Sequence, residues 1–240
     1  MAAIRIEKLR KEYKDVVAVD DLSLAVEEGE LFSLLGVNGA GKTTTIKMLS
    51  TLVAPTSGEA FILGNSIIQD RNIIKEIVDV SMQETAVARK LTVEENLDLY
   101  AKLSGQNKTE AEESKREVYS AFDLGSVKNK RADRLSGGWQ RKLSIALALV
   151  SHPKVLFLDE PTLGLDVIAR RELWKTIRSL KNKITIVLTT HYMEEAEALS
   201  DRIGVMKGGR LLFVGTKEEM FARTGKTNVE DAFIEIAEGN

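Results

Sequence analysis

The segment Gly36–Thr43, GVNGAGKT, constrains the fold of this chain more than any other. It fits the pattern G-x-x-x-x-G-K-[ST] and lies between an apolar run, Leu31–Leu35, and a helix-like segment, residues 43–52. In a strand, a glycine-rich loop and a helix that follow one another in this order, successive backbone N–H groups of the loop point inward at phosphate oxygens. The helix that follows adds its positive N-terminus. We therefore predict a phosphate-binding loop at the carboxyl end of a strand in an α/β fold.

Two side chains of this loop have distinct expected contacts. Lys42 is expected to reach the β- and γ-phosphates of a nucleotide, and the Thr43 hydroxyl is expected to ligate Mg²⁺. The loop backbone supplies the remaining contacts. The predicted nucleotide-binding set from this segment is Asn38, Gly39, Gly41, Lys42, Thr43 and Thr44.

Two further apolar runs end abruptly at polar residues: KVLFLDEP, residues 154–161, and ITIVLTTH, residues 184–191. Such runs are typical of strands buried on both faces of a partly parallel sheet, whose carboxyl ends carry the functional residues. We expect Asp159 to contact Mg²⁺ and Glu160 to act as a general base or to orient water. His191 is expected to hydrogen-bond the γ-phosphate and the attacking water.

Two other residues extend this predicted site. Gln83 ends a strand-like run, residues 77–83, and its side-chain amide is predicted to ligate Mg²⁺ and to act in catalysis. Tyr13 follows the first predicted strand, residues 4–9, and offers a ring face on which adenine can stack.

Between residues 84 and 150 the strand pattern disappears and helix-forming residues dominate. Thr92 and Glu95 have the spacing of a capping box, and the amphipathic residues 109–125 predict a helix that ends at Gly125. We interpret this region as a helical subdomain inserted into an α/β core. The expected organisation is a single domain, residues 1–240, with a core of residues 1–83 and 151–240 and an insert of residues 84–150.

The composition excludes several classes of function. With 34 Lys and Arg against 36 Asp and Glu, the net charge of −2 gives no bulk attraction to nucleic acid. There is no Cys, which excludes disulfides and thiolate metal sites. The longest apolar run, Ile145–Val150, is far shorter than the ~20 residues that a membrane-spanning helix needs. We expect a soluble cytoplasmic chain that reaches a membrane only through a partner.

The motifs together resemble those of a known family. Their sequence and spacing are similar to the Walker A, Q-loop, signature, Walker B, D-loop and H-loop motifs of ABC transporter ATPase subunits, here residues 36–43, Gln83, residues 135–139, residues 155–160, Asp166 and His191. The resemblance implies a P-loop NTPase fold, with a RecA-like core of mostly parallel sheet, an antiparallel β region and an inserted ABC α-helical subdomain. It also implies ATP hydrolysis with Mg²⁺ by the nucleotide-binding subunit of a transporter.

The resemblance further implies two protein partners and a location. One partner is a separate membrane-spanning permease, and the other is a second ATP-binding subunit, either an identical copy or a paralogue. The chain would then lie peripherally on the inner face of the cell membrane, held there by the permease. A nucleic-acid partner is not expected.

The signature segment RLSGGWQRK, residues 134–142, runs into an apolar helix pattern and predicts a second helix N-terminus that could bind an anion. In the family, two ATPase subunits meet head to tail, so that the signature of one contacts the ATP on the other. The resemblance therefore adds to the nucleotide-binding set Ser136, Gly137, Gly138 and Asp166. Two residues depart from the pattern that is common in the family: Trp139 stands where Gln is common, and Val37 stands where Pro is frequent. The predicted phosphate ligands are intact. The departure is expected to alter the contacts near Trp139.

Within the family, the segments around residues 34–49, 189–203 and 228–239 are most similar to the ABC-2 type exporters, which include NatA-like and DrrA-like systems. An alternative is a soluble ABC ATPase that acts on nucleic acid, ribosomes or cluster assembly. The translation-factor type would carry two cassettes in tandem, and the chromosome-maintenance type would have a long coiled coil between phosphate loop and signature. This chain has one cassette and a short insert. A GTPase is a third class, but the Asp of NKRAD, residues 129–133, lies one position too late for a guanine motif.

Overall fold

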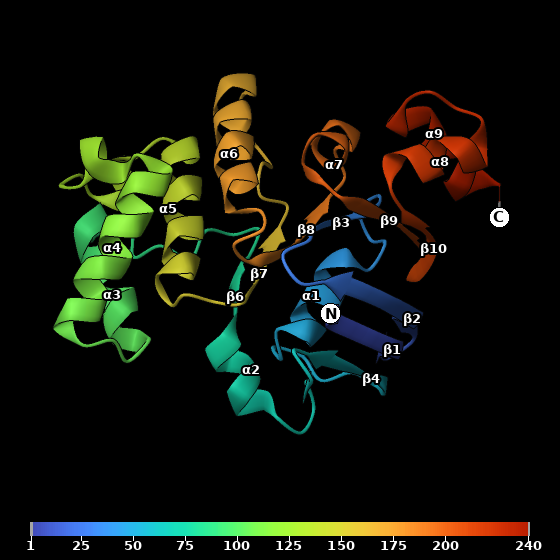
Figure 1. Cartoon of the computed structure of the whole chain (residues 1–240), viewed down its shortest axis with the longest axis horizontal. Coiled ribbons are helices and arrows are strands. Elements are labelled where there is room, and N and C mark those ends of the chain that lie inside the picture. The colour runs from blue at the N-terminus through green and yellow to red at the C-terminus, as the bar shows by residue number, and fades with distance from the viewer. Residues whose placement is uncertain (1, 240) are drawn as a thin grey trace.

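The computed structural model describes residues 2–239, and its larger sheet has six strands in the order β10-β9-β3-β8-β7-β6 (Figure 1). Five strands are parallel and only β10 is antiparallel to its neighbour, β9. The mostly parallel sheet that the sequence predicts is therefore confirmed. Its strands are β3 (Leu31–Leu35), β6 (Val78–Ser81), β7 (Val155–Asp159), β8 (Thr185–Thr190), β9 (Arg202–Lys207) and β10 (Arg210–Gly215).

A second, antiparallel sheet has the order β2-β1-β4-β5, and it confirms the predicted antiparallel region. Its strands are β1 (Ala2–Tyr13), β2 (Val16–Glu27), β4 (Ser57–Ile62) and β5 (Asn65–Ser66). The first strand is longer than the predicted residues 4–9, because β1 and β2 stay paired as a long hairpin through several register shifts. Each shift interrupts the alternation of apolar and polar residues from which a strand is predicted.

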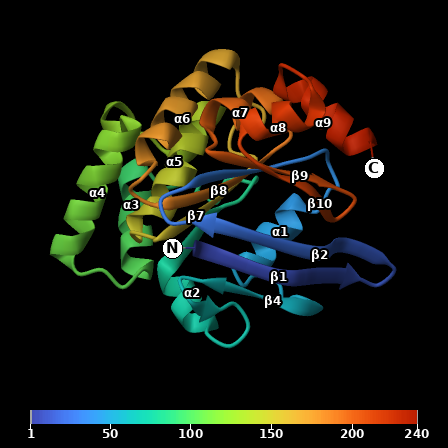
Figure 2. The same ribbon diagram turned by 45° about the vertical axis from the view of Figure 1, so that its right-hand side comes forward.

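Helix α1 (Lys42–Leu49) lies between the two sheets, as Figure 2 shows. Its Ile46 and Met48 belong to an apolar core shared with the antiparallel sheet and with one face of the parallel sheet. Successive strand residues alternate between faces: Phe157 of β7 is in this core, whereas Leu156 is in the core on the opposite face. The remaining helices of the α/β part are α2 (Arg71–Ile77), α6 (Val167–Leu180), α7 (Met193–Leu199), α8 (Lys217–Thr224) and α9 (Val229–Glu238).

Residues 84–150, all within the described part of the chain, contain no strand. Their helices are α3 (Val93–Leu103), α4 (Lys108–Phe122) and α5 (Gly137–Val150), with two short 3₁₀ turns, Leu124–Val127 and Ala132–Arg134. The predicted capping box at the start of α3 is confirmed: the Thr92 side chain accepts from the Glu95 N–H, and the Glu95 carboxylate accepts from the Thr92 N–H.

The predicted helix end at Gly125 is wrong. Helix α4 ends at Phe122, because Asp123 adopts a left-handed conformation, with φ 53°, and turns the chain. This turn places Leu124 in the apolar core. One apolar cluster joins α3, α4 and α5 to β7 and β8. The division into a core of residues 1–83 and 151–240 and an insert of residues 84–150 stays a proposal.

The helices of the insert lie at one end of the molecule, and α8 and α9 lie at the other (Figure 1). Among residues 2–239, none of the helices combines the length and the apolarity needed to cross a bilayer. The two sheets and α1 meet near the centre of the molecule (Figure 2).

Candidate active site

A cavity of about 490 Å³ lies between the β1–β2 hairpin, the glycine-rich loop and the carboxyl ends of the parallel strands. Ten of its lining residues belong to the predicted site, namely Tyr13, Asn38, Gly39, Gly41, Lys42, Thr43, Thr44, Gln83, Glu160 and His191. A larger cavity of about 770 Å³ lies between α4, α5 and α6, and its walls carry none of the predicted residues. We place the candidate active site in the smaller cavity.

Glycine is required at two positions of the loop because the backbone approaches other segments closely. A Cβ at Gly36 would lie 2.3 Å from the Met206 carbonyl oxygen, and a Cβ at Gly41 would lie 2.3 Å from that of Ala18. Gly41 also adopts φ 103° as the residue that caps α1. The loop is thereby held against both the parallel sheet and the hairpin, at the N-terminus of α1.

Lys42 is the buried cation of the site, with 5% of its surface exposed. Its Nζ donates to the carbonyl oxygens of Gly36 at 2.7 Å and Val37 at 3.2 Å. It also lies 3.3 Å from Glu160 Oε1, in a buried ion pair. The ammonium is therefore held inside the loop, beside the carboxylate at the end of β7.

Glu160 connects Lys42 to His191. Its Oε2 accepts from His191 Nδ1 at 2.8 Å. Because a carboxylate only accepts, Nδ1 carries the hydrogen of this contact, and Nε2 of the neutral ring is then an acceptor. Three of the four predicted catalytic residues thus form one array, with Lys42 from the start of α1, Glu160 from the end of β7 and His191 from the end of β8.

Asp159 is fully buried and lies beside the loop threonine. Its Oδ1 accepts from Thr43 Oγ1 at 3.0 Å and from Thr189 Oγ1 at 2.6 Å. Its Oδ2 has no hydrogen-bond partner within residues 2–239. A buried carboxylate oxygen left without a partner is costly unless a cation neutralises it. Hard oxygen donors next to a phosphate loop fit Mg²⁺, which is usually held by one or two carboxylates and by substrate phosphates.

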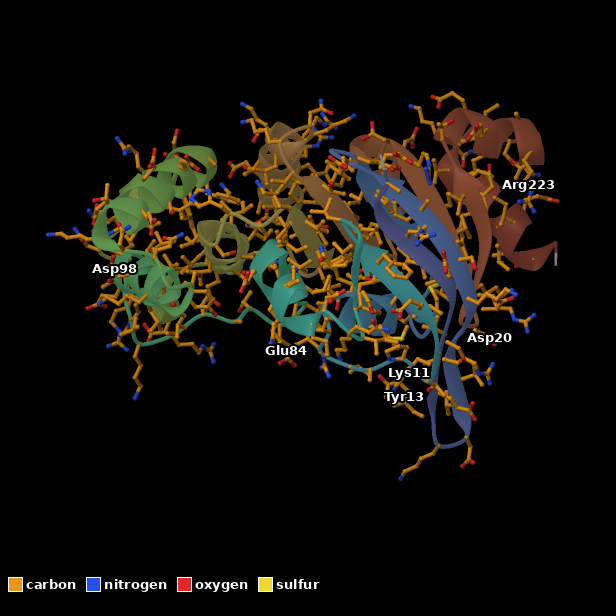
Figure 3. The ribbon with its side chains drawn as sticks, turned by 60° about the horizontal axis from the view of Figure 1, so that its bottom comes forward. Lys11, Tyr13, Asp20, Glu84, Asp98 and Arg223 are labelled. Atoms are coloured by element: carbon orange, nitrogen blue, oxygen red, sulfur yellow. The ribbon has the colours of Figure 1, made fainter. Side chains whose placement is uncertain are left out.

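Tyr13 ends β1 at the edge of the cavity, and 41% of its surface is exposed. Lys11 Nζ lies 4.9 Å from the centre of its ring, and Figure 3 shows the two side chains together on the hairpin. A cation over one ring face leaves the other face as the candidate for stacking. Gln83 lies two residues beyond β6 and also lines the cavity.

The structure does not bring the four other predicted residues to this cavity. Ser136 and Asp166 cap helices: Ser136 Oγ accepts from the Trp139 N–H at 3.5 Å, and Asp166 Oδ1 accepts from Ile168 and Ala169 N–H groups at 2.9 Å. Gly137 and Gly138 begin α5. A Cβ at Gly138 would lie 3.1 Å from the Ala169 Cβ, so the signature segment lies against the start of α6.

Arg141 is a buried residue of the site region that the sequence analysis missed; only 4% of its surface is exposed. It lies on the same face of α5 as Ser144, Ile145 and Ala148, which are all buried. This i, i+3, i+4, i+7 pattern is the sequence signal that could have indicated that Arg141 is buried. Burial lowers the Arg141 pKa to about 10, although the carboxylates of Asp159, Glu195 and Glu160 act in the opposite direction. Arg141 is therefore a protonated cation at neutral pH.

Comparison with protein families and curated proteins identifies relatives. The family model described as ABC transporter matches residues 19–163. The chain is 38% identical over 229 residues to the daunorubicin resistance ATP-binding protein DrrA3 of Streptomyces coeruleorubidus, covering 95% of this chain and 72% of that protein. It is 44% identical over 220 residues to the phospholipid-transporting ATPase ABCA3 of Homo sapiens, covering 90% of this chain. It spans only 13% of the length of that human protein.

Two solved structures share the fold. A structure of the ATP-binding subunit of an ABC transporter has a TM-score of 0.87 and 27% sequence identity, and the match covers 98% of this chain and 99% of that one. The dimeric ATP-binding cassette MJ0796, bound to ADP and Pi after hydrolysis, has a TM-score of 0.79 and 25% identity, covering 89% of this chain and 98% of that one. The family model covers more than half of this sequence, and the site has the phosphate loop and the strand-end carboxylates in place. The chain therefore belongs to the ABC transporter family, in which it is an ATP-binding domain and an ABC ATPase.

Proposed function

We propose that this ABC ATPase drives export through a separate membrane-spanning permease, and that the array of Lys42, Glu160 and His191 hydrolyses its ATP. The observation that carries the catalytic part is the pair of contacts at Glu160, 3.3 Å to Lys42 Nζ and 2.8 Å to His191 Nδ1. Export rests on the similarity to the daunorubicin resistance protein DrrA3.

In the proposed reaction, Lys42 and the loop backbone hold the β- and γ-phosphates of ATP. A water oxygen bonds to the γ-phosphorus while the bond from that phosphorus to the bridging oxygen of ADP breaks. Glu160 orients the water and takes its proton, and His191 holds the carboxylate through Nδ1. The products are ADP and inorganic phosphate. Tyr13 stacks on the adenine ring, and Asn38, Gly39, Gly41 and Thr44 complete the phosphate cradle.

Mg²⁺ would be held by Thr43, by Asp159 through its unpartnered Oδ2, and by the side chain of Gln83 from the cavity wall. When bound there, it would neutralise the charge of the transferring phosphate. The Thr43–Asp159 hydrogen bond supports this proposal, because it joins two of these ligands before the metal arrives.

The second ATP-binding subunit is proposed to contact this ATP through its own Ser136, Gly137, Gly138 and Asp166. Support comes from their location outside the cavity, on a surface where the apolar residues Val167 and Ile168 are strongly exposed. The related dimeric cassette supports a pair of such domains. Whether the second subunit is an identical copy or a paralogue depends on the complex in which this chain works.

The permease is proposed to dock near residues 84–150 and Gln83, at the inner face of the cell membrane, with no nucleic-acid partner. The test is affinity isolation of the tagged chain from detergent-solubilised membranes of its own cells. A polytopic membrane protein in fixed stoichiometry is the expected result, and Lys42→Ala should recover it equally well while it lacks ATPase activity. Recovery with ribosomes or nucleic acid, and without a membrane protein, would support the alternative of an ABC ATPase outside transport.

A further inference from the structure

The backbone of Glu160 is held in an unfavourable conformation. Its φ of 48° lies in the left-handed region, which costs a residue other than glycine about 1–3 kcal/mol. The next residue is Pro161, which itself favours an extended residue before it. Such a conformation persists only where the surroundings determine it. One support is the hydrogen bond from the Glu160 N–H to the Thr189 carbonyl oxygen at 3.1 Å.

Arg141 provides the other support, from both sides of Glu160. Its Nη2 donates to the Asp159 carbonyl oxygen at 2.7 Å, and its Nε donates to the Pro161 carbonyl oxygen at 2.8 Å. The two acceptors are the carbonyl oxygens of the residues directly before and directly after Glu160. A planar guanidinium with donors in a fixed fork can hold two such oxygens at a set separation.

The same guanidinium also holds the backbone of the two residues that follow β6, Met82 and Gln83. Its Nη1 donates to the carbonyl oxygens of Met82 at 2.6 Å and Gln83 at 3.2 Å. One turn along α5, Ser144 Oγ lies 3.1 Å from Ser81 Oγ at the end of β6. The signature helix is thus joined to the ends of β6 and β7 through Arg141.

Arg141 itself is not among the residues that line the cavity. All four of its hydrogen bonds within the described chain go to backbone carbonyls, so its contribution to the site is geometric. The nearby carboxylates of Asp159, Glu160 and Glu195 favour its charged form. A neutral or shorter side chain would leave buried carbonyl oxygens without donors.

We propose that Arg141 is a positioning residue that sets the backbone of Glu160, so that its carboxylate can take the proton of the water that attacks ATP. The inference rests on the proposed role of Glu160 as the base. It predicts an effect on the chemical step and not on nucleotide binding without Mg²⁺, because the hydrogen bonds of the guanidinium within the described chain go to residues 82–83, Asp159 and Pro161 and none goes to the phosphate loop.

The test is the ATPase rate of Arg141→Lys, which keeps the charge but replaces the fork by a single ammonium. Displacement of a reacting group by about 1 Å can cost ~10²-fold in rate, so kcat should fall by about 10- to 10²-fold. The affinity for fluorescent ATP measured without Mg²⁺ should change less than about threefold, because Lys42 and the loop backbone that hold the phosphates are unaltered. A wild-type kcat in Arg141→Lys would show that the charge alone suffices and would overturn the proposal.

A double-mutant cycle with Glu160→Gln tests whether Arg141 acts through Glu160. Residues that act as one unit lose activity non-additively, so adding Arg141→Lys to Glu160→Gln should lower kcat by less than about threefold more. A further loss of about tenfold or greater would mean that Arg141 acts elsewhere. If Glu160→Gln alone has a wild-type rate, the proposed base falls and the positioning claim falls with it. A slow Glu160→Gln beside a fast Arg141→Lys overturns the positioning claim only.

The matched control for lost stability is Leu147→Ala on the same helix. Leu147 is buried in the apolar core, and truncation should cost about 2–5 kcal/mol of stability. Its kcat at a temperature where it is folded should equal that of the wild type. Arg141→Gln serves as the second variant. If neither Arg141 variant folds by circular dichroism at low temperature, Arg141 is required for stability and the proposal is overturned.

Discussion

At the scale of single residues, the contacts of Asp159 predict how the ATPase activity depends on Mg²⁺. Its Oδ1 is used by two hydroxyls and its buried Oδ2 has no partner within the described chain. Asp159→Asn keeps the size but removes the charge that would face Mg²⁺. The Mg²⁺ concentration for half-maximal ATPase should rise at least about tenfold, roughly the 1.4 kcal/mol of one lost charged contact.

Fluorescent-ATP binding without Mg²⁺ should stay unchanged in Asp159→Asn, because Lys42 and the loop backbone are intact. The matched control is Asp98→Asn, whose carboxylate pairs with Lys115 far from the cavity, in the helical region that Figure 3 shows. An unaltered Mg²⁺ requirement in Asp159→Asn would exclude Asp159 as a metal ligand.

At the scale of elements, the edge strand β6 carries a half-buried carboxylate, that of Asp79. Burial raises the pKa of Asp79, although its contacts with the Val80 N–H and the Ser151 hydroxyl oppose the shift. A carboxyl group with a folded-state pKa above its unfolded value destabilises the fold when ionised, and this cost disappears as pH falls below the unfolded pKa. Asp79→Asn should therefore raise the melting temperature at pH 8 by about 2–4 °C, equivalent to ~1 kcal/mol.

The pH dependence of this gain is the diagnostic measurement. The advantage of Asp79→Asn over wild type should shrink as the pH is lowered from 8 towards 4, because the wild-type carboxyl then becomes neutral. The exposed Asp15→Asn, at the tip of the β1–β2 hairpin, should show no such gain. A gain that is constant with pH would show that ionisation of Asp79 is not its cause.

The sequence predicted the elements that carry a strong local pattern. The glycine-rich loop between β3 and α1, the strand ends at Asp159, Glu160 and His191, and the capping box of α3 depend on adjacent residues, and each is observed. The long hairpin and the end of α4 were predicted incorrectly, since pairing across β1 and β2 and the turn at Asp123 depend on tertiary contacts. Arg141 was not predicted as a residue of the site because its acceptors lie in two segments that are distant from it in the sequence, residues 82–83 and 159–161.

At the scale of the whole molecule, the starts of α1 and α5 differ in their position relative to the cavity. The start of α1 faces the cavity, whereas the start of α5, capped by Ser136, lies outside it. In the proposed dimer, this second start contacts the ATP of the other subunit. Glu160→Gln should therefore dimerise on addition of Mg-ATP, and Ser136→Arg added to it should keep it monomeric by light scattering.

Nucleotide affinity in this double variant should change by less than about tenfold, roughly 1.4 kcal/mol, because Ser136 is not part of the chain's own cavity. Ser120→Arg on the exposed side of α4 is the matched control and should still dimerise. Dimerisation of the Ser136→Arg double variant, or complete loss of ATP binding, would place Ser136 in the site of its own subunit.

Glu160, held between Lys42 and His191, is proposed to activate the water that attacks ATP. The most direct measurement is single-turnover ATP hydrolysis by Glu160→Gln, with ATP binding measured on the same sample. The expected result is a rate lower by about 10² to 10⁴, the usual contribution of a positioned general base, with near-normal binding. Lys42→Ala should instead weaken binding itself, and Glu197→Gln, an exposed change on α7, should hydrolyse ATP normally. Hydrolysis by Glu160→Gln at the wild-type rate would contradict the account.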